Sequence, residues 1–295
     1  MNSISRKVWS LLIVVAAYSF VSISFAQYAV EVLSYDQGTT ATQVFNPDPN
    51  APPEFFNMDL ASLGSPERFT GEGVFPGAVT PFNPAFLTNE IVSVGESGHL
   101  SLRLSNFVIP QAGGPEIGVF ANTGLIDVDF PNGQAGSPAT AFGVDSADVD
   151  VSEDGINWVA LGNMVFDIPA SGYNDIAQTV PSDFQKPFVG PFSSFDGLAL
   201  EDPNSPDILE LLDGSGGGKW LDISGSGLSQ VGYIRFRVDD DGNSGIELNF
   251  ELDAVSIASN AMGTATVPEP STVLYLAIAG LLTAYTDRNS RKNRV

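Results

Sequence analysis

Hydrophobic and polar residues alternate along much of the chain with a period of two, which is typical of strands buried on one face. The clearest case is residues 99–104, where Leu100, Leu102 and Leu104 fall on one side. Clusters of Gly, Pro, Asn and Asp separate such segments, and no ten-residue stretch between the chain ends shows a helical stripe. Six further strands are predicted, at residues 28–32, 117–120, 147–151, 158–161, 231–238 and 246–257.

This pattern predicts an all-β protein, most simply an antiparallel β-sandwich of jelly-roll or galactose-binding-like type. Residues 27–262 fit one such domain better than two. Pro, Gly, Ser and acidic residues dominate residues 37–84 and 167–219. We expect these two segments to be long loop inserts that lie on the sandwich.

The N-terminal segment has the pattern of a signal peptide. Two basic residues, Arg6 and Lys7, precede an apolar run that extends to Phe25. Ser24-Phe25-Ala26 supplies the small residues that a signal peptidase requires. We therefore predict that residues 1–26 are removed by cleavage between Ala26 and Gln27. An uncleaved N-terminal anchor helix is the alternative.

The C-terminal segment combines a proline motif, an apolar stretch and a basic tail. The motif is Val267-Pro268-Glu269-Pro270, followed by an apolar stretch at 273–284 and a basic run at 288–294. A helix over 271–286 would extend about 24 Å at ~1.5 Å per residue, short of the ~30 Å hydrocarbon core. The basic tail fits the cytoplasmic side, which would place the rest of the chain outside. A permanent anchor helix is the simpler alternative.

In their order and their place, this motif, helix and tail resemble the PEP-CTERM sorting signal of Gram-negative bacteria. The resemblance covers residues 263–295 and implies recognition by a membrane exosortase that cleaves near the motif. It also implies release or attachment at the cell surface, commonly in bacteria that make exopolysaccharide. Pro268 and Pro270 would keep the motif extended, as a processing enzyme requires.

Parts of the central region resemble discoidin-like and other galactose-binding-like sandwiches. Residues 148–158 are similar to a strand, turn and strand of those domains, and residues 233–238 and 250–255 to their closing strands. Many PEP-CTERM surface proteins share a segment like residues 92–95 before a Leu-rich strand. The resemblance implies a sandwich fold and transfers no binding residue.

Composition and charge exclude several classes of function. The chain has no cysteine, so disulfides, thiolate metal sites and a cysteine nucleophile are excluded. The formal net charge is −23, which opposes binding to nucleic acid or to anionic membrane surfaces. Metal cations and cationic partners stay open, although the acidity could serve only to keep an exported protein soluble. Six of the 12 basic residues lie in the end segments, so the central region is still more acidic than the whole chain. These six are Arg6, Lys7, Arg288, Arg291, Lys292 and Arg294.

No catalytic motif is evident. His99 lies on the strand face opposite the leucines. It is the single histidine, and the chain has no cysteine, so the zinc patterns fail. No G-x-S-x-G elbow occurs. Residues 214–220 lack the first Gly and the Ser or Thr of a phosphate loop, and we interpret them as a flexible turn. The 35 acidic residues select no catalytic pair, so a non-enzymatic role is expected.

One acidic cluster is suited to calcium. Asp239, Asp241 and Asn243 lie in a turn between two predicted strands, and Glu251 and Asp253 follow in the second strand. Calcium binds six to eight oxygens from carboxylates, amides and carbonyls. A solvated acidic turn is the alternative. Glu251 and Asp253 would share one sheet face, where like charges are costly if they are buried without compensation.

A sugar-binding surface is a further candidate. Trp158, Trp220 and Tyr173 could stack on sugar rings, or they could fill the core, as aromatic residues in a sandwich commonly do. For Trp158, which follows an Asp-Gly turn, we expect a place in the core. We thus expect an exported protein of the cell surface or extracellular matrix with a structural or interaction role. A carbohydrate-binding module and a glycan-active enzyme are the alternatives. Expected partners are signal peptidase, exosortase, exopolysaccharide and, through the C-terminal helix, the membrane, but not nucleic acid.

Overall fold

The computed structural model describes residues 27–43, 52–70, 77–200, 208–240 and 248–269. The predicted signal peptide and C-terminal helix lie outside these ranges. Within them, no helix is long and apolar enough to span a membrane.

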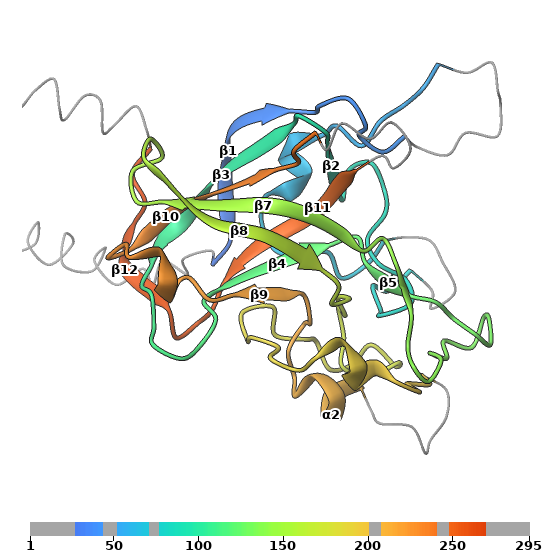
Figure 1. The fold of residues 1–295 in the computed structure, drawn as a ribbon. Helices are drawn as coiled ribbons and strands as arrows, with labels where there is room; N and C mark the ends of the chain where they lie inside the picture. Colours follow the sequence, from blue (N-terminus) through green and yellow to red (C-terminus); the bar gives the residue numbers. More distant parts are fainter. Residues whose placement is uncertain (1–26, 44–51, 71–76, 201–207, 241–247, 270–295) are drawn as a thin grey trace, which may run out of the picture.

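Two antiparallel sheets make up most of the described fold (Figure 1). The larger, called sheet B here, has the order β1-β3-β10-β7-β8, and β12 pairs with the end of β3 that β1 leaves free. Its strands are β1 (Ala29–Asp36), β3 (His99–Val108), β10 (Val231–Arg237), β7 (Asp145–Ser152), β8 (Trp158–Phe166) and β12 (Met262–Thr266).

The smaller, sheet A, has the order β2-β11-β4-β9. Its strands are β2 (Val92–Gly95), β11 (Asn249–Ile257), β4 (Ile117–Ala121) and β9 (Lys219–Leu221). A short ladder joins β5 (Gly124–Leu125) to β6 (Ala141–Phe142). The helical elements are short: η2 (Asp59–Ser62), η3 (Phe192–Phe195), α2 (Ile208–Leu212) and η4 (Ser224–Ser226).

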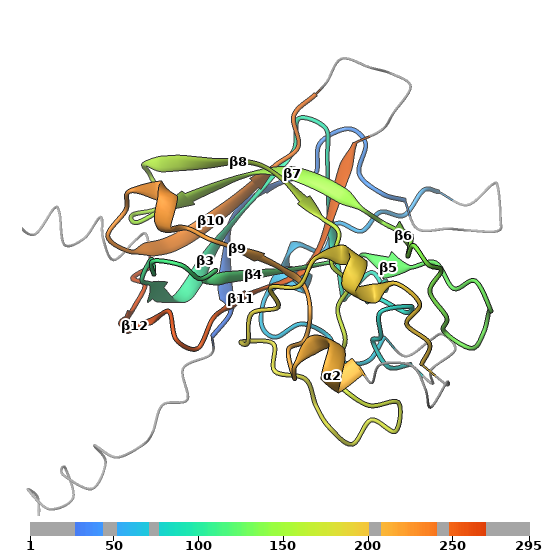
Figure 2. The same cartoon turned by 60° about the horizontal axis from the view of Figure 1, so that its bottom comes forward.

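Sheets A and B pack face to face, as the turned view shows (Figure 2). Alternation in β3 directs its three leucines inward, and all three are fully buried. On the neighbouring strand, Ile234 pairs with Leu102 and Phe236 with Leu100. Phe250 of sheet A lies 5.0 Å from Phe236 between ring centroids, so aromatic rings join the two layers. The prediction of an antiparallel all-β fold is confirmed.

Each predicted segment contains a strand, and several strands are longer than the alternation indicated. Residues 246 and 247 of the last predicted segment lie outside the described residues. Sheet pairing continues to Thr266, past residue 262, where we expected the sandwich to end. Among the described strands, the sequence pattern missed β2, β5, β6, β9 and β12. Strand β9 has only three residues and follows a glycine run. That run is not a flexible exposed turn, because Ser215 is fully buried and a Cβ on Gly216 would lie 2.1 Å from the Phe184 ring. Glycine is needed here for close packing.

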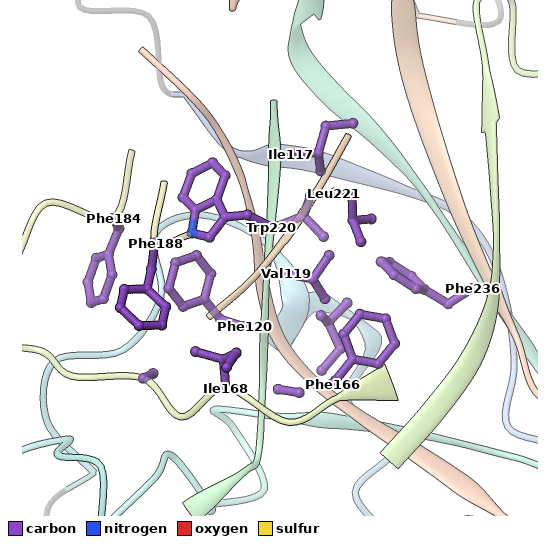
Figure 3. Packing of buried hydrophobic residues seen from close by; sticks show 14 of the residues in the cluster. Ile117, Val119, Phe120, Phe166, Ile168, Phe184, Phe188, Trp220, Leu221 and Phe236 are labelled. Atoms are coloured by element: carbon purple, nitrogen blue, oxygen red, sulfur yellow. The ribbon is translucent and has the colours of Figure 1, made fainter. Parts of the chain in front are cut away.

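The outer face of sheet A is covered by the second insert, so β4 is buried on both sides. Figure 3 shows Val119 facing Phe236 and Phe166 in the sandwich core, and Phe120 on the opposite side beside Trp220 and Phe188. Phe120 also meets Phe184 of the insert at 5.2 Å between ring centroids. A third layer made of loops therefore packs on the sandwich, which explains why β4 shows no polar face.

Candidate functional site

The predicted calcium residues are distributed over two sheets. Asp239 follows β10 of sheet B, and its Oδ1 lies 3.1 Å from Nη1 of Arg237. Glu251 and Asp253 belong to β11 of sheet A. Asp241 and Asn243 lie outside the described residues. In the part of the chain that the structure describes, no group of three or more acidic or histidine side chains is placed to hold a metal ion.

Glu251 is buried beside a second carboxyl group. Its Oε2 accepts a hydrogen bond of 2.6 Å from Nδ2 of Asn122, and its backbone N–H donates to Oδ2 of Asp145 at 3.1 Å. Burial, with a smaller contribution from the Glu251 charge, raises the pKa of Asp145 to about 8. Asp145 is therefore protonated near neutral pH. The proton bound to Asp145 removes its charge and so relieves its repulsion by Glu251.

Asp253 is buried under the first insert. Its Oδ2 accepts a hydrogen bond of 3.1 Å from the backbone N–H of Glu67. Burial raises the pKa of Asp253 well above its ordinary value, and the nearby charges of Glu67 and Glu90 raise it further. The pKa of Glu67 is also raised, first by burial and then by Glu90. The cost anticipated for burying Asp253 as a charged group is thus reduced, because a raised pKa favours its neutral form.

The two inserts are joined by Arg68. Its guanidinium donates to the carbonyl oxygens of Gly172 and Ser182, the second at 2.8 Å. It also lies 4.4 Å from the centroid of the Phe184 ring. These contacts connect residues of the first insert to the second one, and they bring the loop layer together over sheet A.

The three aromatic residues considered for sugar binding lie in separate parts of the fold. Trp158 is half-buried on the outer face of sheet B, where the Arg235 guanidinium lies 4.4 Å from its ring centroid, so our expectation that Trp158 fills the core was wrong. Alternation in β8 turns it away from the sandwich interior. Tyr173 packs on Phe69 of the first insert. Trp220 is buried on β9. They do not form one stacking surface.

Trp220 contributes instead to an open groove between β9 and the second insert. The groove has a volume of about 500 Å³. The ion pair between Lys219 and Asp167, 2.9 Å from Nζ to Oδ1, lies along it. Its lining combines aromatic rings, prolines and charged groups, among them Phe188, Pro191, Phe192, Trp220 and Asp222. Such a mixture is typical of binding grooves for small polar ligands.

His99 lies on the outer face of sheet B, as its alternation predicts. Its Nε2 is 3.1 Å from Oγ of Ser34 on the adjacent strand. In the described residues, this histidine belongs to no metal-binding group. This exposed contact adds one side-chain link to the backbone pairing of β1 with β3.

Gln27, the predicted first residue of the mature chain, contacts the last strands. Its carbonyl oxygen accepts a hydrogen bond of 2.8 Å from the N–H of Ile257. Its Nε2 lies 3.3 Å from Sδ of Met262. Ala26 lies outside the described residues.

Three residues of the sorting motif are described, and Pro270 is not. Val267 is 2% exposed, although the three residues before it are exposed and Glu269 is exposed as well. The side chain of Val267 packs against β3 and β10, where a Cβ on Gly232 would lie 2.8 Å from its Cγ1. The first half of the motif therefore lies on the outer face of sheet B. Sequence reasoning missed this contact, because a single valine after a polar stretch gives no pattern.

No protein-family model matches the chain. A search of curated proteins likewise gives no match.

Proposed function

We propose that this chain is an exported protein that is sorted to the cell surface or extracellular matrix and has a structural or interaction role there, without enzymatic activity. Signal peptidase and a membrane exosortase would act on it during export. The C-terminal helix would hold it at the membrane until processing. Exopolysaccharide is the proposed neighbour of the mature protein, and nucleic acid is not a proposed partner.

The observation that carries this proposal is the ordered C-terminal series of Val267-Pro268-Glu269-Pro270, an apolar stretch and a basic tail. One further feature is compatible with it. The last described strand ends at Thr266, so Pro268 and Glu269 follow the strands, and Glu269 is exposed.

Replacing Glu269 and Pro270 together by alanine is expected to abolish processing in a host that carries the sorting enzyme. The reason is that the enzyme would lose the charge and the proline-restricted backbone that distinguish this segment. Mass spectrometry of wild type and variant, with fractionation of membrane and medium, measures the effect. The matched control is Glu153 and Pro181 to alanine, which changes the same residue types outside the motif. Equal masses and locations for wild type and the Glu269 and Pro270 variant would disprove sorting through this motif.

Carbohydrate binding is the second candidate, and the groove at Trp220 favours it. Aromatic rings next to a carboxylate and an ammonium group are suited to sugar rings, which present apolar faces and hydroxyl groups. Replacing the half-buried Phe192 by alanine is expected to weaken binding to the host's exopolysaccharide at least fivefold, as measured by calorimetry. Trp158→Ala on the opposite sheet serves as the control. Unchanged affinity in the Phe192 variant would place any sugar site elsewhere.

Two finer assignments belong to the same proposal. We assign the sandwich to the jelly-roll or galactose-binding-like type, supported by the passage of the chain between sheets: β1 and β3 lie in sheet B, β2 and β4 in sheet A.

We keep calcium as a proposed ligand of the predicted turn that contains Asp239, Asp241 and Asn243. Glu251 and Asp253 would serve it only if they lost their present contacts.

A further inference from the structure

Val267 is held by backbone and side-chain contacts at once. Its N–H donates to the carbonyl oxygen of Ser105 at 3.2 Å. Its own carbonyl oxygen accepts a hydrogen bond of 2.9 Å from Nη1 of Arg103. Both polar groups of this residue are therefore bonded to β3, and the buried side chain adds an apolar contact.

Pro268 is held by the central strand of sheet B. Its carbonyl oxygen accepts a hydrogen bond of 2.7 Å from the hydroxyl group of Tyr233. That tyrosine is 1% exposed, and burial raises its pKa, so the hydroxyl keeps its proton at physiological pH. Arg103 also pairs with Glu31 on β1, which fixes the guanidinium that binds Val267.

Glycines give the segment its space. A Cβ on Gly232 would meet Val267 and also the Phe107 ring at 2.9 Å. On the neighbouring turn, a Cβ on Gly155 would lie 3.3 Å from the Tyr233 ring. We call the set Arg103, Ser105, Phe107, Gly232 and Tyr233 the C-terminal clamp.

We propose that the C-terminal clamp is an autoinhibitory contact: it withholds Val267 and Pro268 from the sorting enzyme and so sets the rate of processing. The proposal rests on the proposed sorting function. An enzyme that cleaves a peptide bond grips several extended residues and bonds to their backbone groups. In the clamped state the N–H and C=O of Val267 and the C=O of Pro268 already have partners. The clamp must open before the enzyme can bind both halves of the motif.

The opening equilibrium would then control access. When opening is fast relative to cleavage, the rate of processing follows the population of the open form. Loss of one hydrogen bond from the clamp is expected to raise that population about fivefold. A substitution that loosens the clamp should therefore speed processing of an unchanged motif.

The first variant is Tyr233→Phe, which removes only the hydroxyl group that binds Pro268. The second is Gly232→Ala, whose methyl group would displace Val267. Amide exchange of Val267 in the purified full-length protein measures opening without the sorting enzyme. We expect exchange about fivefold faster in Tyr233→Phe. Pulse labelling in a host that carries the sorting enzyme should then show processing faster by a similar factor.

Tyr35→Phe is the matched control. It also removes one tyrosine hydroxyl bond, 2.8 Å to the carbonyl oxygen of Ser93, away from the clamp. Its Val267 exchange and its processing should equal those of wild type. Unprotected exchange of Val267 in wild type would overturn the clamp itself. Faster exchange without faster processing would overturn the autoinhibition. Absence of any processing in wild type would instead contradict the sorting function, while the exchange data would still test the clamp.

Discussion

Replacing Arg68 by methionine is expected to lower the free energy of unfolding by about 3 kcal/mol. The guanidinium donates to two carbonyl oxygens of the second insert and lies over the Phe184 ring. Hydrogen bonds to a charged group contribute about 1.5–3 kcal/mol each, and a cation–π contact about 0.5–2 kcal/mol, against which the burial of the charge must be set. Urea unfolding of the wild type and the variant measures the difference.

Two further variants test whether the geometry of the guanidinium or its charge is responsible for the stabilisation by Arg68. Arg68→Lys keeps the charge but has no planar guanidinium, so it cannot bind the carbonyl oxygens of Gly172 and Ser182 in the same way. We expect it to lose most of the stabilisation that Arg68 contributes. Arg237→Met removes an arginine that is paired with carboxylates on the partly exposed face of sheet B, and it should cost about 1 kcal/mol. Equal losses at positions 68 and 237 would show that the inserts do not depend on Arg68.

The second large effect is a loss of stability as the pH rises. The pKa of Asp145 is about 8 in the folded protein, against an ordinary value near 4 in the unfolded chain. The folded protein therefore binds this proton more tightly, so the contribution is complete below pH 4 and is lost as the pH rises to 8. Asp253, whose pKa is also raised, acts in the same direction. Allowing for partial solvent screening, Asp145 alone should lower the free energy of unfolding by about 2 kcal/mol between pH 5 and pH 8.

Asp145→Asn isolates this contribution. Asparagine has the same shape and is neutral at every pH, so the difference in stability between pH 5 and pH 8 should shrink by about 2 kcal/mol. Denaturant unfolding at the two pH values measures it. Asp222→Asn is the control, because hydrogen bonds with Ser224 lower the pKa of Asp222 and keep its titration below pH 4. If the difference in the free energy of unfolding between pH 5 and pH 8 were the same in the Asp145 variant as in wild type, this carboxyl group would be ionised in the folded protein.

At the acidic end the sign reverses. The pKa of Asp154 is lowered to about 2, first by the hydrogen bond from the backbone N–H of Asn157 and then by other bonds in the same turn. Its contribution is present above pH 4 and is lost as the pH falls to 2. The raised and lowered groups together place the maximum of stability in the mildly acidic range.

Local patterns were sufficient to predict seven of the twelve strands in the described residues. Leu100, Leu102 and Leu104 alternate with polar residues because one face of β3 meets the core and the other meets solvent. The same rule placed His99 on the outer face. It failed for β2, β5, β6, β9 and β12, since strands of two to five residues give few positions in which to show a period. Trp158 was misplaced by a different argument, because a turn preceding an aromatic residue does not specify which face that residue takes.

The sequence by itself determined an all-β fold, the two insert segments and the linear C-terminal series that suggests sorting. These depend on residue type and spacing over a few neighbouring positions. Only the tertiary structure decided that β4 is buried on both faces, that Arg68 joins the inserts, and that Val267 and Pro268 lie against Arg103 and Tyr233. Each of these contacts joins residues far apart in the chain. The raised pKa values of Asp145 and Asp253 likewise follow from burial, which is a property of the packed fold rather than of any local sequence pattern.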